Sequence, residues 1–207
     1  MKSSTLMLAA VLVSLLMGAT GCNSLTIENV RKLQIDHTTD AEIKTLFGDP
    51  KTSETFDTDG AKVAVRYFQY QLATDVGPVA WLNYYILHIE TKDGVAKGYL
   101  YVSDEGKNAT VFDPSKADQI QYGVTTRQQA IDLLGPPAGM AFKASKLDAI
   151  KKIDPASNVA SYLMWVNAPP ASGIVGFLKV QISVLIVQLD ANDKVISKTS
   201  ITDEQGF

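Results

Sequence analysis

Two stretches of the chain share a helical pattern of apolar residues. Residues 38–50 align without gaps on residues 125–137, and in each stretch the apolar residues recur at the i, i+3, i+4 spacing of one helix face. These positions are Ile43, Leu46 and Phe47 in the first stretch and Ala130, Leu133 and Leu134 in the second. The pattern predicts a short amphipathic helix in each stretch, and the alignment indicates an internal repeat.

Both predicted helices have start and stop signals in the sequence. Thr39 with Glu42, and Thr126 with Gln129, form the S/T-x-x-E/Q capping box, which satisfies backbone N–H groups at the start of a helix. A Gly-x-Pro sequence follows each helix. The glycine can adopt the left-handed conformation that ends a helix, and the proline cannot continue it.

Strand-like segments follow each predicted helix. Residues 83–90 and 179–189 are β-rich, and each run leads through a turn signal into a second strand-like stretch. The turn signals are residues 92–94 and 191–194, and the second stretches are residues 95–102 and 195–201. Each copy of the repeat is therefore predicted to be a helix followed by about three antiparallel strands.

The repeat predicts an α+β fold built from two tandem helix-plus-antiparallel-sheet units. The first unit covers residues 33–107 and the second covers residues 119–207, and residues 108–118 form the linker between them. Units of this length bury only about 60–65% of their surface and are marginally stable alone. We therefore expect the two units to pack together.

The second copy carries an insertion of about eight residues around Phe142 to Asp154. We expect a short amphipathic helix to begin near Ser145, with its apolar side chains facing inward. These apolar residues are Leu147, Ile150 and Ile153. Its lysines form a basic patch, which is either a solvated helix face or a surface for anionic headgroups. The patch consists of Lys143, Lys146, Lys151 and Lys152.

Residues 1–21 have the layout of a secretory signal peptide. Lys2 precedes an apolar run from Leu6 to Met17, and a stretch of small residues follows that run. The run is about 12 residues long, whereas a membrane-spanning helix needs roughly 20. We therefore expect this segment to direct export and to be removed.

The only cysteine of the chain stands directly after the signal peptide. The sequence from Ala19 to Cys22 resembles the bacterial lipobox, which implies diacylation of the Cys22 sulfur, and the alternative is an ordinary signal peptide with a chance cysteine. Two or more acyl chains hold a protein on a bilayer for practical purposes permanently. Asn23 follows the cysteine where aspartate would favour the inner membrane, so the resemblance implies the periplasmic face of the outer membrane. Residues 22–32 would then form a lipidated tether.

The composition is that of a folded globular protein without nucleic-acid partners. The chain is 46% hydrophobic and 20% charged, and 19 Lys and Arg residues against 22 Asp and Glu residues give a net charge of -3. Its two histidines, His37 and His88, have no nucleophile or metal-ligand cluster near them in the sequence. Hydrolase, phosphate-loop and dinucleotide-binding motifs are also missing from the sequence. We predict that the protein is not an enzyme and uses no cofactor or metal.

The helix motif carries a resemblance to a known family. The Thr-Thr-x-x-Glu/Gln helix that closes on Leu-Phe/Leu-Gly-x-Pro, behind a lipobox and before aromatic-rich strands, is similar to the BamE (SmpA/OmlA) family of small outer-membrane lipoproteins. Members of that family contain one such unit. The tandem arrangement resembles the β-lactamase inhibitory protein fold, in which two such units form one concave surface.

Several aromatic residues are candidates for a partner-binding surface. Matched segments of the two copies place an aromatic residue before a leucine, at Trp81-Leu82 and Phe177-Leu178. Further aromatic residues on the predicted strands could line a concave sheet, namely Tyr67, Tyr70, Tyr162 and Trp165. The alternative for all of them is packing in the core.

The resemblance implies a non-enzymatic outer-membrane lipoprotein. Its function would be to bind envelope proteins as a scaffold in envelope integrity or β-barrel assembly. Two other classes stay open. One is a protein inhibitor of a soluble enzyme, which the tandem arrangement allows. The other is a carrier of a small apolar ligand or lipid, which requires an enclosed pocket.

Overall fold

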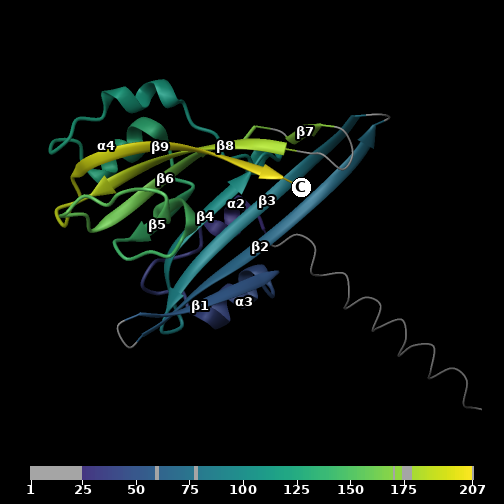
Figure 1. The fold of residues 1–207 in the computed structure, drawn as a ribbon, viewed down its shortest axis with the longest axis horizontal. Helices are drawn as coiled ribbons and strands as arrows, with labels where there is room; N and C mark the ends of the chain where they lie inside the picture. Colours follow the sequence, from purple (N-terminus) through teal and green to yellow (C-terminus); the bar gives the residue numbers. More distant parts are fainter. Residues whose placement is uncertain (1–24, 59–60, 77–78, 170, 174–178, 207) are drawn as a thin grey trace, which may run out of the picture.

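One antiparallel sheet of nine strands forms the body of the described chain (Figure 1). The computed structural model describes residues 25–58, 61–76, 79–169, 171–173 and 179–206. The strands are β1 (Thr52–Thr58), β2 (Ala61–Val76), β3 (Val79–Lys92), β4 (Val95–Ser103), β5 (Gly139–Phe142), β6 (Ser161–Asn167), β7 (Ala171–Gly173), β8 (Lys179–Leu189) and β9 (Val195–Gly206). The helices are α2 (Ile27–Val30), α3 (Asp40–Phe47), α4 (Arg127–Leu134) and α5 (Asp148–Lys151), with 3-10 turns η1 (Gly106–Asn108) and η2 (Pro114–Gln119).

The strand order divides the sheet into two arms that are joined twice. The first arm consists of β1, β2, β3 and β4, and the second arm consists of β6, β8 and β9. β5 lies between β4 and β6 and pairs with both. β7 pairs with β3 at residues 80–82 and with β8 at Lys179, beyond the ends of β4 and β6. The arms are therefore connected through β5, which pairs with β4 at Tyr99 and Leu100, and bridged by β7 at one end (Figure 1).

The two faces of the sheet bury different cores. On the outer face, α2 and α3 pack on the first arm and η2 and α4 pack on the second. On the inner face, α5 packs over a core that draws on both arms. Strand periodicity separates these cores in β6, where Leu163 and Trp165 belong to the outer face and Tyr162, Met164 and Val166 belong to the inner face.

The two helices predicted from the repeat are confirmed, with both capping boxes. The Thr39 hydroxyl accepts from the Glu42 N–H at 3.4 Å, and the Glu42 carboxylate accepts from the Thr39 N–H at 2.8 Å. Thr126 and Gln129 make the same two contacts at 3.3 and 2.9 Å. Each helix ends at a glycine with positive φ, as the Gly-x-Pro sequence predicts.

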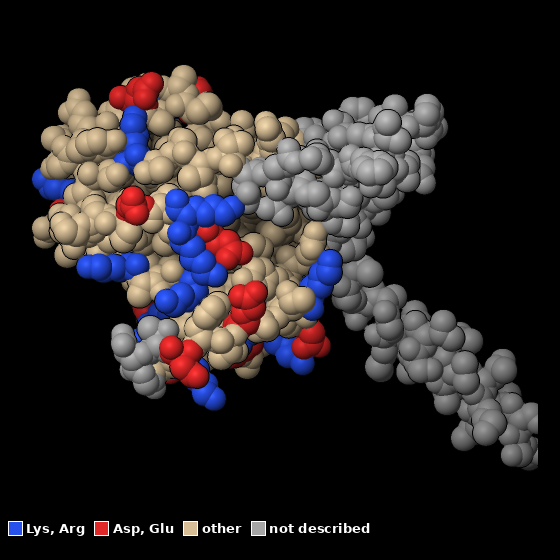
Figure 2. All heavy atoms as spheres, in the orientation of Figure 1, with Lys and Arg blue, Asp and Glu red and all other residues tan. Residues whose placement is uncertain are grey.

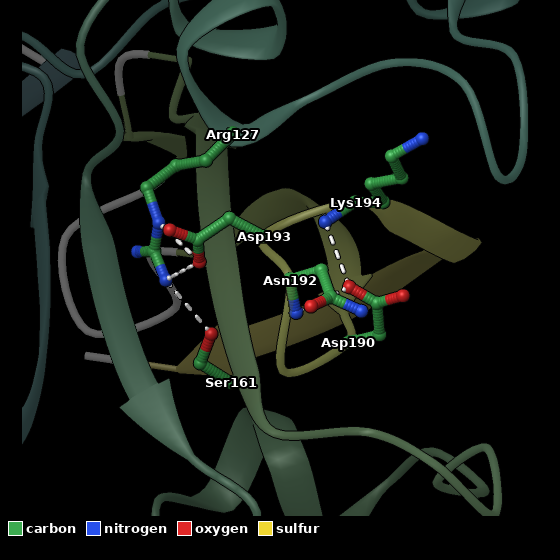
Figure 3. A network of polar contacts seen from close by, with 6 residues as sticks. All are labelled: Arg127, Ser161, Asp190, Asn192, Asp193 and Lys194. Carbon is green, nitrogen blue, oxygen red and sulfur yellow. Dashed lines mark hydrogen bonds and ion pairs between the residues drawn. The ribbon is translucent and has the colours of Figure 1, made fainter.

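The start of α4 is fixed to the turn between β8 and β9 (Figure 3). The Arg127 N–H donates to the Asp193 carbonyl at 2.8 Å, and the Arg127 guanidinium pairs with the Asp193 carboxylate at 2.6 Å. The same guanidinium donates to the Ser161 hydroxyl at 3.0 Å. Within the turn, the Asp190 carboxylate accepts from the Lys194 N–H at 2.9 Å. The predicted turn at residues 191–194 is thus confirmed and holds a helix in place.

The start of α3 is fixed in an equivalent way to the turn between β3 and β4. The Asp40 N–H donates to the Gly94 carbonyl at 2.9 Å, and the Asp40 carboxylate pairs with Arg66 at 2.7 Å. Asp93 and Gly94 both have positive φ, as a tight hairpin turn requires. The helix here supplies the acid and the sheet supplies the arginine, so the charges are the reverse of those at α4.

The predicted division into two tandem helix-plus-sheet units is wrong. The strands of both copies form one continuous sheet, because β5 completes the hydrogen bonds between β4 and β6. Glycine residues permit the close approach of β5 to β4. A Cβ on Gly139 would lie 2.6 Å from the Tyr99 carbonyl oxygen, and a Cβ on Gly98 would lie 3.1 Å from the Met140 carbonyl oxygen. Met140 packs against both outer-face cores, so these are also continuous.

The chain from Leu25 to Leu33 packs on the outer face of the first arm. Val30 and Leu33 are buried in the core beneath α3, and Leu25 and Ile27 pack against its edge. The Ile27 N–H also donates to the Asn108 side chain at 3.2 Å. Within the predicted tether at residues 22–32, Leu25, Ile27 and Val30 therefore pack in the core of the first arm. Among the described residues, no helix combines the length and apolar character needed to cross a membrane.

Candidate functional site

A cleft of about 620 Å³ opens on the inner face, and both arms contribute to its walls. Strands β2, β3 and β4 line it from the first arm, β8 and β9 line it from the second, and α5 forms a further wall. Most of the lining residues are apolar, namely Ile86, Leu100, Val102, Ala149, Ile182, Val184 and Ile201. Small-molecule sites typically have about 300–1,000 Å³ and a largely apolar lining, so this cleft is the candidate functional site.

The apolar walls follow from the two-residue period of the strands. Leu100 and Val102 on β4 point to the inner face, whereas Tyr101 between them packs in the outer-face core. On β8, Ile182 and Val184 alternate in the same way. These four residues form an apolar surface of branched side chains on β4 of the first arm and β8 of the second arm. An apolar ligand would remove this surface from water, which is the main favourable contribution to such binding.

Two neutral aromatic side chains supply polar groups within the cleft. The rings of Tyr67 on β2 and His88 on β3 make an edge-on contact with centroids 4.7 Å apart. Burial lowers the pKa of His88 to about 4, although the Asp148 charge acts in the opposite direction. Burial, followed by the charge of Asp148, raises the pKa of Tyr67 to about 12. Both side chains are therefore uncharged at neutral pH and can only offer hydrogen bonds to a ligand.

The helix α5 is held over the inner face by apolar contacts and by one buried carboxylate. Leu147 is fully buried and Ile150 is 5% exposed, as the sequence pattern predicts. Glu90 on β3 accepts hydrogen bonds from the Ser145 hydroxyl and from the Lys146 N–H. Burial raises the pKa of Glu90, and these hydrogen bonds partly oppose that rise. The segment before α5 is thus fixed to the first arm by polar contacts as well as by packing.

Among the residues whose side chains the structure describes, the charged members of the cleft lining come from α5 and its C-terminal end. They are Asp148, Lys151 and Lys152. Asp148 and Lys151 form an ion pair at 3.0 Å, with side chains that are 50% and 39% exposed. The Lys151 ammonium also lies 5.2 Å from the centre of the Phe56 ring. Elsewhere on the face seen in Figure 2, Lys and Arg side chains lie next to Asp and Glu side chains, so no charge of one sign dominates.

The structure separates the aromatic residues that the sequence suggested for partner binding. Tyr67 lines the cleft. Tyr162 and Trp165 are each 1% exposed, and they lie in cores on opposite faces of the sheet. The Trp165 indole N–H donates to the Gly135 carbonyl at 2.8 Å, which fixes β6 to the end of α4. Neither Tyr162 nor Trp165 offers exposed surface to a partner.

The other predicted site residues are only partly covered by the structure. Tyr70 lies on β2, where it pairs with Tyr85, and Trp81 and Leu82 lie on β3, where they pair with β7. The side chains of these three lie outside the described part. Phe177, Leu178 and Cys22 lie outside the described residues altogether.

Sequence reasoning did not find the cleft itself. His88 has no nucleophile or metal-ligand cluster near it in the sequence, and the apolar lining residues have the alternation of an ordinary core. The usable signal was the lysine-rich insertion, because two of its lysines line the cleft. In the part of the chain that the structure describes, no cluster of three His, Cys, Asp or Glu side chains is arranged to hold a metal ion.

Comparisons with known proteins give one structural similarity. The sequence matches no protein-family model and no curated protein. The structure is similar to that of a protein from Streptococcus mutans described as a candidate beta-lactamase inhibitor, with a TM-score of 0.43 and 12% sequence identity. The similarity covers 84% of this chain and 96% of the other. At this level it establishes neither a shared family nor a shared function.

Proposed function

We propose that the protein is a non-enzymatic binding protein of the bacterial envelope that holds a small apolar ligand in the cleft between its arms. The cleft itself carries this proposal. It has a volume of about 620 Å³, and it interrupts the inner-face core at a place where apolar side chains of four strands converge. A site of this size and lining suits a small apolar molecule.

The envelope location rests on the N-terminal sequence. The signal-like residues 1–21 and the lipobox-like sequence before Cys22 support a lipid anchor on a membrane, by resemblance the outer membrane. Only two residues lie between Cys22 and Leu25, which packs against the outer face. The three Cα–Cα steps from Cys22 to Leu25 span at most about 11 Å, so the sheet would stay close to the bilayer. Replacement of Cys22 by alanine should release the protein from the membrane fraction, and retention of a processed chain there would exclude the anchor.

The ligand proposal can be tested by filling the cleft. Full-length protein would be purified from its native membranes and examined by native mass spectrometry for bound small molecules. Val184 lines the cleft on β8, so Val184→Phe should abolish the bound mass. Val124 is 61% exposed and outside the cleft, so Val124→Phe makes the same chemical change as a control and should keep it. If wild-type protein carries no small molecule and binds none from a membrane-lipid extract, the proposal is wrong.

A protein-binding role is the second candidate, because one turn exposes large apolar side chains. Tyr122 is 55% exposed and Val124 is 61% exposed, on either side of Gly123 at the start of the second repeat motif. Exposed aromatic residues commonly anchor protein interfaces. Crosslinking in native cells with Tyr122→Ser as the comparison would test this role. Loss of a specific crosslinked envelope protein in the variant would support a scaffold, and an unchanged pattern would count against it.

A further inference from the structure

We propose that His88 recognises the ligand of the cleft, and that its imidazole N–H donates a hydrogen bond to an uncharged oxygen of an otherwise apolar molecule. A ketone, an ester or an alcohol supplies such an oxygen. This inference rests on the proposed ligand-binding function and adds the chemistry of the ligand. It depends on what surrounds the imidazole, which lies on β3 in the wall of the cleft.

The neighbours of His88 on the sheet are mostly apolar or aromatic. In the strand register, His88 lies between Tyr67 on β2 and Leu100 on β4, and all three side chains line the cleft. Ile86, two residues along β3, lines the same wall because side chains of a strand alternate between faces. In the other direction along β3, the Glu90 carboxylate accepts hydrogen bonds from the segment before α5. The imidazole is therefore a polar group within a largely apolar wall.

The imidazole has hydrogen-bonding capacity that the described part of the chain does not use. Its contacts there are the edge-on Tyr67 ring, with centroids 4.7 Å apart, and the charge of Asp148, and neither is a hydrogen bond. Because burial lowers the pKa of His88 to about 4, at neutral pH one ring nitrogen donates and the other accepts. The Tyr67 hydroxyl, in contrast, is hydrogen-bonded to Glu54. Buried polar groups nearly always have a hydrogen-bond partner, and a ligand oxygen would provide one for His88.

The oxygen that His88 recognises should be uncharged. A charged group at this wall would lose its hydration, and the neutral imidazole and the side chains of Tyr67 and Leu100 offer it no opposite charge. The charge that acts on the imidazole is that of Asp148, which would oppose an anionic oxygen at the same place. An ammonium group has no lone pair to accept from the imidazole N–H. A carbonyl or hydroxyl oxygen meets both requirements.

The test compares two probes of the same shape. Dodecan-2-one and 2-methyldodec-1-ene differ only in a carbonyl oxygen that is replaced by a methylene group. Their binding to the full-length protein would be measured by displacement of a fluorescent probe, in the wild type and in His88→Phe. The phenylalanine ring can keep the contact with Tyr67 but has no nitrogen. The ratio of ketone affinity to alkene affinity should fall about fivefold in His88→Phe, which is the effect of one neutral hydrogen bond.

Two further variants control for changes in the shape of the cleft. Tyr67→Phe removes the hydroxyl next to the imidazole, and Leu100→Met alters the apolar wall on its other side. Both keep His88, so both should leave the ratio of the two affinities unchanged. A fall in the ratio in Tyr67→Phe as large as that in His88→Phe would assign recognition to the tyrosine instead and overturn the inference.

A measurement on the wild type keeps the test valid if His88→Phe does not fold. The chain has two histidines, so the imidazole nitrogens of His88 can be compared with those of the exposed His37 in ¹⁵N NMR spectra. Dodecan-2-one should shift the nitrogen signals of His88 more than the alkene does, and neither probe should shift those of His37. Equal effects of the two bound probes, or an unchanged affinity ratio in folded His88→Phe, overturn this inference but leave a ligand-binding cleft. Failure of both probes to bind overturns the proposed function as well.

Discussion

Acidification from pH 7 to pH 5 is expected to destabilise the protein through His88. Burial on the inner face lowers the pKa of this side chain from 6.5 to about 4. In the unfolded chain the imidazole takes up a proton near pH 6.5. Between these two values the unfolded state binds more protons than the folded state, so stability falls as the pH falls.

The size of the effect follows from the displacement of the pKa. Each unit is worth 1.36 kcal/mol, so the complete displacement from 6.5 to about 4 corresponds to about 3 kcal/mol. At pH 5 only part of this range has been crossed, and the linkage relation gives a loss of about 2 kcal/mol relative to pH 7. For a chain of this length, that loss lowers the melting temperature by roughly 4–8 °C.

The assay is thermal unfolding at pH 7 and pH 5 with matched variants. His88→Gln keeps a polar side chain that does not titrate, and His37→Gln makes the same change at an exposed position. Burial raises the pKa of Glu90, so this residue adds stability as the pH falls, but it does so in all the proteins alike. The wild type and His37→Gln should lose 4–8 °C more on acidification than His88→Gln. An equal loss in His88→Gln would refute the reasoning.

Three further substitutions test the packing of the sheet and its helices. Gly139→Val should cost about 2 kcal/mol or more, because a Cβ there would lie 2.6 Å from a carbonyl oxygen of β4; an unchanged midpoint of urea unfolding would contradict this. Thr126→Val should cost about 1 kcal/mol by removing the cap of α4, whereas Thr45→Val, outside any cap, should melt like the wild type. Trp165→Phe should cost about 2 kcal/mol because the Gly135 carbonyl loses its donor; wild-type stability would show that water replaces it.

The parts of the fold that could be predicted are those determined by neighbouring residues. The capping boxes, the helix periods and the tight turn at Asp93-Gly94 depend on contacts a few positions apart, and they were found where the sequence placed them. The pairing of β5 with two other strands depends on distant residues. β5 has four residues, begins at Gly139 and lies next to the insertion, so its own pattern is too short to indicate a strand. The single sheet was missed for this reason.

The candidate site could not be predicted either, because it too depends on residues that are far apart in the sequence. Leu100, Val102, Ile182 and Val184 alternate as core residues do, and nothing local shows that the arms leave a cleft above them. The β7 bridge joins the two arms and α5 packs over both, and these are long-range features. The lysine-rich insertion was recognised as unusual, and it proved to form one wall of the cleft. The lysines of the insertion were therefore the only local sequence signal for the site that we recognised. The apolar lining residues gave no such signal.

The β7 bridge also sets the order in which the chain can complete its fold. Its pairing with β3 joins residues about ninety positions apart, and contacts of such separation form slowly. A growing chain that has reached residue 169 contains all of β3 but no β7. The backbone groups of residues 80–82 that pair with β7 therefore have no hydrogen-bond partner on that strand until β7 has been made. Exposed strand edges of this kind pair readily with other chains. A chain that ends before β7 should therefore aggregate, even though both capped helices and six of its strands have already been made.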